Sequence, residues 1–577
     1  MTSETPHLDN RAAERAGSRA DAIGERGVAV GGADSNGELQ TANRSLRDLV
    51  IEAGLAVLDR DGLSLGARSL GYTRVFDHLE REHGIKVTRA SVHERIWPSH
   101  NDYRRDVVAE AIAHLPTNLF ATRDDEVRAW VIDMWARGLD ASERVAEFSR
   151  HLGPLVFSMI SEMPAYRDIQ KAKAMAAPLN DPLTTEALRG PIRDRVAAIL
   201  ATVRYRMAAL TAGLGLQPKP ALGLDDVEVH ELLSVLFMNL LLGAFLDVNS
   251  GSDEIMRPVA FLGRPSTGQA PWTMLAIGIK AAIDQLYEDA GNGPPKVADP
   301  PPPDLVPPLR ISAGDRTRRR RREELRELVL AAGVEVLLRE RMDLRPESLS
   351  YASVFAHLRE EHGLTVYRSS VHNRVWASHD DYLLDVLTRG IHSDPNPNLL
   401  AVADLIRPVL EGLSAGTVSR HQAALDILRI VTAAEIERSL TSIDYLRRQA
   451  IKAALLTEPG SDVMTSLRQA IHTTQLQRAG RHAVAIRDHV LALGFEVRPE
   501  LGIGVEEALR ILVVVALTSA GGAIFDQSAG VQAVARAYPI QREGGGADGW
   551  LAPSVAMWAC FDLLFQEAGA TPDIRGT

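Results

Sequence analysis

Apolar residues recur every three or four positions along nearly the whole chain, and the alternation that marks a β-strand is nearly absent. Two stretches with this helical spacing are Leu46, Leu49, Val50, Ala53, Val57, Leu58 and then Leu325, Leu328, Val329, Ala332, Val336, Leu337. Ser99 and Ser378 each precede an aspartate by three residues, which is typical of a helix start. The pattern predicts an all-α protein.

The chain contains an internal duplication of one sequence unit. Residues 46–107 align with 325–386 without a gap at a constant offset of 279, and 33 of the 62 positions are identical. Weaker matches continue at this offset: Asp247 falls on Asp526, and Trp272 meets Trp550 after a slip of one residue. A proline-dense segment, 293–308, separates the copies and favours an extended spacer. Two copies of roughly 250 residues agree with the two or more domains that are expected from a chain of 577 residues.

The part of each copy that is retained best predicts a helix-turn-helix. In the first copy a helix from Tyr72 to His83 meets a turn at Gly84, and a second helix runs from Arg89 to Trp97. The second helix of such a motif enters the major groove of DNA. The residues we expect to contact DNA are Arg89, Ser91, His93, Arg95, Arg368, Ser370, His372, Asn373 and Arg374. The plainer interpretation is an exposed polar helix on a helical bundle.

With these residues the sequence resembles the tetracycline-repressor (TetR) family of bacterial regulators. The resemblance covers about 65 residues of each copy and rests on Val87-Thr88-Arg89-Ala90-Ser91-Val92-His93 with Trp97-Pro98-Ser99, and on the matching residues 366–372 and 376–378. His93 and His372 stand where the family usually has a tyrosine that contacts phosphate. The turn after Gly84 is also longer than the family's turn.

The resemblance implies two tandem TetR-like units, each with an N-terminal helix-turn-helix domain and a larger C-terminal helical bundle. The expected division is a disordered arm (1–43), a first DNA-binding domain (44–115), a first helical ligand-binding and dimerisation-like domain (116–292), a proline-rich linker (293–315), a second DNA-binding domain (316–394) and a second helical ligand-binding and dimerisation-like domain (395–570). Six arginines lie between 316 and 322, where an arm could follow phosphates.

A single chain that carries two different DNA-reading helices suggests a DNA site with two unlike halves. Glu94 corresponds to Asn373, and glutamate accepts from cytosine whereas asparagine pairs with adenine. We therefore expect an asymmetric double-stranded operator. The apolar stretches 232–241 and 511–517, with the helices near the end of each copy, are expected to pair the copies or to form each copy's own core. Pairing within the chain gives a monomeric pseudo-dimer, and pairing between chains gives a homodimer.

The composition of the chain narrows the classes of protein to which it can belong. The net charge of −11 argues against a protein that coats nucleic acid indiscriminately, although a local basic face remains compatible with it. The stretches 232–248 and 508–525 are expected to be buried helices and not membrane spans, which points to a cytoplasmic protein. The single cysteine, Cys560, is expected to be a small buried hydrophobe.

No catalytic, metal-binding or cofactor motif is evident, so we expect a transcriptional regulator, a repressor by analogy, without enzymatic activity or cofactor. The family resemblance leaves open whether the larger helical domains bind a small apolar ligand. The alternative is a helical scaffold or ligand-binding protein that has lost DNA reading.

Overall fold

The computed structural model describes 72–83, 86–89, single positions from 97 to 112, 123–163, single positions from 166 to 173, 182–262, 270–291, 350–362, 365–366, 368, single positions from 376 to 386, 399–442, positions 445, 449 and 452, 462–541 and 547–569. The predicted arm, the proline-rich linker, the arginine run and the first predicted helix of each copy lie outside these residues. Most of the described residues are helical, which confirms the predicted class.

The two copies have the same order of elements. The helices of the first copy are α3 (Tyr72–His83), α6 (Asp124–Ala136), α7 (Ala141–Glu162), α9 (Pro182–Gly213), α10 (Asp226–Asn249) and α11 (Met274–Leu286). Those of the second are α13 (Tyr351–His362), α16 (Leu399–Ser414), α17 (Arg420–Thr441), α19 (Asp462–Ala492), α20 (Val505–Ser528) and α21 (Ala552–Leu564). The duplication therefore extends beyond the stretch in which the residues remain alike.

Local sequence sets several of these helix bounds. Asp140 caps the start of α7 and Asp225 caps the start of α10, each with a glutamate three residues on that completes a capping box. The first helix of the predicted helix-turn-helix, α3, ends at His83 as predicted, and its counterpart α13 ends at His362. Sixteen residues of α10 are buried around its whole circumference, because this helix lies in the centre of the body and not at its surface.

The structure also contains short antiparallel strand pairs, which the helical pattern did not predict. In the first copy β1 (Leu216–Pro218) pairs with β4 (Tyr287–Asp289), and β2 (Pro258–Val259) pairs with β3 (Trp272–Thr273). In the second copy β5 (Phe495–Val497) pairs with β8 (Phe565–Glu567), and β6 (Ala537–Gln541) pairs with β7 (Ala547–Leu551). Each pair joins segments that flank the central helices.

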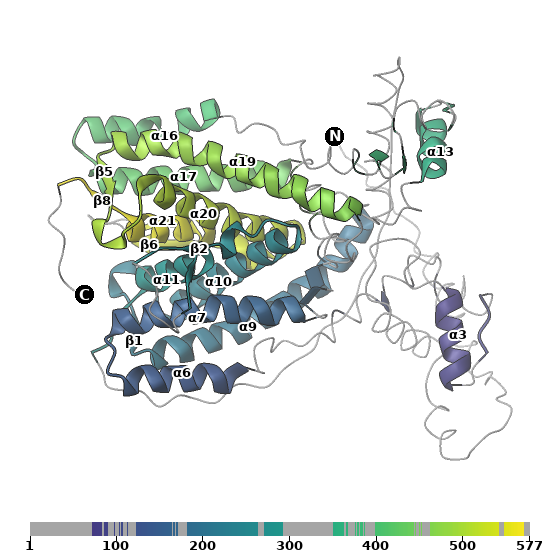
Figure 1. Cartoon of the computed structure of the whole chain (residues 1–577), viewed down its shortest axis with the longest axis horizontal. Helices are drawn as coiled ribbons and strands as arrows, with labels where there is room; N and C mark the ends of the chain where they lie inside the picture. The colour runs from purple at the N-terminus through teal and green to yellow at the C-terminus, as the bar shows by residue number, and fades with distance from the viewer. Residues whose placement is uncertain are drawn as a thin grey trace, which may run out of the picture.

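The central helices of the two copies pack against one another. Helix α10 contacts α20 along its length, and α11 contacts α21, so four helices meet in the middle of the body. Helices α6, α7 and α9 lie on one side and α16, α17 and α19 on the other (Figure 1). The predicted four-helix contact between copies is thus present within one chain, and the same helices also form each copy's own core.

Two of these helices, α10 and α20, are long and apolar enough to cross a membrane by length and composition. Their most apolar windows are 89% and 78% buried inside the body. They are core helices of a packed protein, as the sequence predicted.

Candidate functional site

Each predicted reader domain is organised around the same aromatic cluster. In the first copy the Tyr103 ring lies 5.0 Å from Tyr72 and 5.1 Å from Trp97, and all three are buried. The Trp97 indole donates to Asp106 at 2.8 Å, which satisfies its polar edge. The second copy repeats the cluster, with Tyr382 at 5.0 Å from Tyr351 and 5.1 Å from Trp376. The repeated aromatic residues therefore form the same buried cluster in both copies.

The predicted aspartate cap is present in the second copy. The Ser378 hydroxyl accepts from the backbone N–H of Asp381 at 3.0 Å, and the Asp381 carboxylate accepts from the N–H of Ser378 at 2.9 Å. This reciprocal pair fixes the start of the helix that carries Tyr382. The corresponding Ser99 lies outside the described residues.

The structure places two of the nine residues that we expected to contact DNA. Arg89 and Arg368 are helical and exposed, at corresponding positions of the two copies. The positions Ser91, His93, Arg95, Ser370, His372, Asn373 and Arg374 lie outside the described residues. Helices α3 and α13 lie at the same end of the molecule, beyond the packed helical body (Figure 1). Both helices therefore lie at one end of the molecule, and the described Arg89 and Arg368 are exposed to solvent.

The contact between α10 and α20 has an internal two-fold symmetry. A Cβ added at Gly243 would lie 2.0 Å from the Thr518 carbonyl oxygen, and one added at Gly522 would lie 2.2 Å from that of Asn239. Gly522 and Thr518 are the positions that correspond to Gly243 and Asn239 at the repeat offset. Each helix thus presents a glycine to the other's backbone, and only glycine allows this approach.

Arginines of each copy also bind the end of the other copy's central helix. Arg468 of α19 donates to the Asn249 carbonyl at 3.4 Å, and Arg189 of α9 donates to the Ser528 carbonyl at 3.1 Å. These carbonyls belong to the last residues of α10 and α20, where a positive charge is favoured. The two contacts correspond at the repeat offset, so the chain pairs its copies as a symmetric dimer pairs its subunits.

Two ion pairs cross between the copies, and the lysine of each is buried. Lys173 lies 2.5 Å from the Asp526 carboxylate, and Lys452 lies 2.5 Å from that of Asp247. Burial raises the pKa of Asp526, and the ammonium of Lys173 opposes this shift. Removing Lys173 would leave the buried Asp526 carboxylate without its cation, which makes this pair sensitive to the alignment of the copies.

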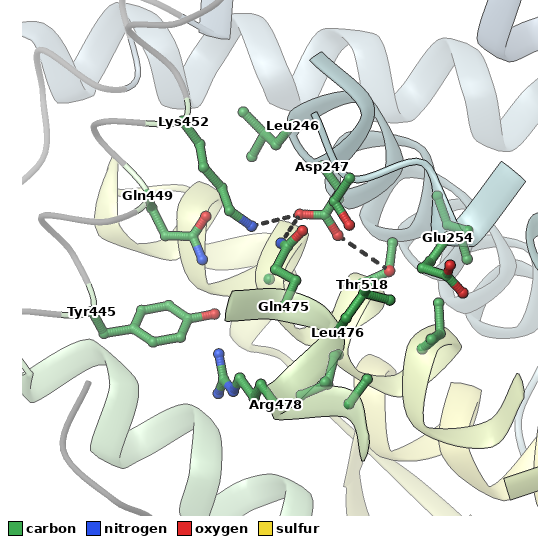
Figure 2. Close-up of a pocket in the computed structure, with 17 residues that line it drawn as sticks. Leu246, Asp247, Glu254, Tyr445, Gln449, Lys452, Gln475, Leu476, Arg478 and Thr518 are labelled. Atoms are coloured by element: carbon green, nitrogen blue, oxygen red, sulfur yellow. Dashed lines mark hydrogen bonds and ion pairs between the residues drawn. The ribbon is translucent and has the colours of Figure 1, made fainter. Parts of the chain in front are cut away.

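The pair formed by Asp247 and Lys452 borders a cavity of about 60 Å³. Gln475 of α19 donates to Asp247 at 2.7 Å, and its other amide atom is buried without a hydrogen-bond partner among the described residues. Arg478 and Tyr445 face the same space (Figure 2), with the guanidinium 5.5 Å from the centre of the Tyr445 ring. The lining residues come from both copies, and the space can hold waters or a small ligand.

The corresponding place in the other half of the molecule has a different character. Val196 and Ile199 of α9 stand where the second copy has Gln475 and Arg478, and both are buried. The Tyr166 ring packs edge-on against Phe245 with 4.9 Å between the ring centres. Gln475 and Arg478 thus have no polar counterparts in the other half, although the lysine–aspartate pair is present in both.

Cys560 is fully buried, and burial raises the pKa of its thiol to about 12. This confirms the prediction of a small buried hydrophobe. No cluster of three or more metal-ligating side chains is present among the described residues.

Sequence reasoning missed the two crossing ion pairs and the cavity. A signal for the pairs existed, because Lys173 and Lys452 correspond at the repeat offset, as Asp247 and Asp526 do. The sequence does not say that each lysine meets the aspartate of the other copy.

Searches of protein-family models, of curated proteins and of solved structures each found no match to this chain.

Proposed function

We propose that the chain is a sequence-specific DNA-binding regulator of transcription, a repressor by its resemblance to the TetR family, and that one polypeptide supplies both DNA readers. The observation that carries the proposal is the internal pairing of the copies, which leaves α3 and α13 at one end of the body with Arg89 and Arg368 exposed. A regulator that binds a two-part operator needs two readers held together. Here the peptide chain and the helix contact both hold them.

The two readers differ, so the operator is expected to have dissimilar halves. Glu94 and Asn373 are the clearest difference, because their side chains favour different bases. Such a protein works inside the cell beside its DNA, and we place it in the cytoplasm. A symmetric operator, with both halves equally required, would contradict this part of the proposal.

The experiment is a gel-shift titration of the full chain with DNA selected from a random pool, at two salt concentrations. Arg89→Ala and Arg368→Ala test the described positions, and Arg95→Ala and Arg374→Ala test the expected base contacts. Arg407→Ala is the matched control, because Arg407 is an exposed arginine on α16. A lost phosphate contact should lower the salt slope by about 1, and a lost base contact should cost about 1–3 kcal/mol.

A discrete, salt-sensitive complex that weakens in the reader variants and not in Arg407→Ala supports the proposal. Selection that yields no enriched sequence and no discrete complex supports the alternative, a helical scaffold or ligand-binding protein. The cavity beside Asp247 keeps that alternative open, because a protein can bind a small molecule without reading DNA. Its lining of charged and amide groups favours a polar ligand over the apolar one that the resemblance left open.

A further inference from the structure

Charged side chains surround the contact between α10 and α20 in two groups, one at each end of the symmetric contact. We call the first group the first rim: Glu507 and Arg510 of α20, with Glu254 and Arg257 of the first copy. Arg257 lies 2.6 Å from Glu507, and Arg510 lies 2.6 Å from Glu254. The first rim thus holds two acids and two bases, and each acid meets a base of the other copy.

The second rim contains the corresponding residues with the copies exchanged: Glu228 and Glu231 of α10, with Ala533 and Arg536 of the second copy. Arg536 binds both glutamates, Glu228 at 2.6 Å and Glu231 at 2.7 Å. The second rim therefore holds two acids and one base. The copies differ here at two positions, where Glu231 corresponds to Arg510 and Glu254 corresponds to Ala533.

These two differences decide which copies are complementary. If a first copy paired with another first copy, each rim would hold three acids and one base, because Glu228 and Glu231 would face Glu254 and Arg257. If a second copy paired with another second copy, each rim would hold one acid and two bases, because Glu507 and Arg510 would face Ala533 and Arg536. Only a first copy against a second copy brings the charges close to balance.

We propose that the rims specify pairing of the first copy with the second and disfavour pairing of either copy with its own duplicate from another chain. The surface around α10 and α20 is then a recognition surface whose partner is the dissimilar copy. The glycine contacts and the buried lysine–aspartate pairs do not discriminate in this way, because both copies carry the same residues there or meet through backbone atoms. The inference does not depend on DNA binding.

The preference for one pairing of copies comes from the difference in free energy between the possible pairings, and not from the strength of any single ion pair. The paired rim side chains are 14–39% exposed, and exposed ion pairs contribute little individually. Specificity arises because the wrong arrangements place like charges together, which is unfavourable wherever salt does not screen it. The contribution of the rims should therefore depend on salt, whereas the packing of α10 on α20 should not.

The test reproduces each like-with-like pattern inside the full chain. Arg510→Glu with Ala533→Glu gives both rims the pattern of two first copies, with three acids and one base each. Glu231→Arg with Glu254→Ala gives both rims the pattern of two second copies. The four substitutions together exchange the rim residues between the copies, and this exchanged variant again has one rim with two acids and two bases and one rim with two acids and one base.

We expect the acidic variant to unfold at a lower urea concentration than the wild type at about 0.01 M salt, and to recover at least half of that shift at about 1 M salt, where the Debye length falls to about 3 Å. The variant with the basic pattern should shift less, since its excess charge is smaller. The exchanged variant should unfold close to the wild type at both salt concentrations, although it contains both damaging pairs of substitutions.

The control is Arg407→Glu with Ala415→Glu, which makes the same charge changes at two exposed positions away from the rims, one in α16 and one in the turn that follows it. It should show neither the low-salt shift nor its recovery. The proposal is overturned if the acidic variant matches this control, or if the exchanged variant is as unstable as the sum of its two halves, since that result would mean that the rim residues act through packing alone.

Discussion

The close approach of α10 and α20 predicts that one methyl group at the crossing destabilises the protein. A Cβ at Gly243 would lie 2.0 Å from the Thr518 carbonyl oxygen, about 1.4 Å closer than the 3.4 Å at which ordinary contact begins. The obstructing atom belongs to the backbone of a buried helix and cannot rotate away. Gly243→Ala therefore forces the two helices apart or bends one of them.

Two opposing effects set the magnitude. Overpacking a buried contact typically costs about 1–3 kcal/mol, and a clash with backbone should lie toward the upper end of that range. Alanine in a helix interior is favoured over glycine by about 0.5–1 kcal/mol. The net expectation is a loss of about 2 kcal/mol for Gly243→Ala, and a similar loss for Gly522→Ala. The double variant should cost less than the sum, because one separation of the helices relieves both contacts.

Urea unfolding followed by tryptophan fluorescence measures these changes, and the chain offers two matched controls. Gly521 lies next to Gly522 in α20, but a Cβ there would lie 3.9 Å from its nearest neighbour, the Tyr445 hydroxyl. Gly480 of α19 is exposed and would meet nothing within 4 Å. Both alanine variants should be stabilised by up to about 1 kcal/mol. If Gly243→Ala were stabilised as these controls are, the helix crossing described here would be refuted.

Three further perturbations test the buried polar groups. Lys173→Met leaves the Asp526 carboxylate buried without its cation and should cost about 3–5 kcal/mol of stability near neutral pH. Because burial raises the pKa of this carboxyl in the folded state, the loss of stability should grow as the pH rises through that pKa and shrink in acid, and urea unfolding at several pH values measures it. Asn239 is fully buried with neither amide atom partnered among the described residues, so Asn239→Thr, which copies Thr518 of the other half, should stabilise the fold by about 1 kcal/mol in the same assay. The buried Cys560 thiol, with its pKa raised to about 12, should react with a thiol reagent only as fast as the protein unfolds, and rapid labelling of the native chain would show that it is accessible.

The features that the sequence predicted well are those carried by repetition and by helical spacing. The bounds of the helix from Tyr72 to His83, the burial of Cys560 and the contact of the apolar helices all follow from residues that are close in sequence or repeated at one offset. Whether the copies would pair within one chain did not follow, because corresponding apolar surfaces on the two copies allow both arrangements. The structure shows the arrangement within the chain.

The short strands and the cavity were not predictable for a different reason. The strand pair of β1 and β4 has three residues on each side, too few to show an alternating pattern, and its two segments are separated by α10 and α11. The cavity is formed by side chains from separate helices of both copies, such as Asp247 and Gln475, which only the tertiary structure brings together. Neither the β1–β4 pair nor the cavity therefore has a local signal in the sequence.

The internal symmetry also explains which positions of the duplicated unit could diverge. Gly243 and Gly522 each face the backbone of the other copy, and no substitution elsewhere can compensate for a Cβ that meets a carbonyl group. Glu231 and Arg510 instead meet side chains, so a change of charge at one can be offset by a change across the contact. A duplicated chain can therefore become complementary to itself at side-chain contacts while it stays symmetric at backbone contacts. Once the charges differ, each copy fits its dissimilar partner better than a second example of itself, and this allows the rest of the two copies to diverge without losing their pairing.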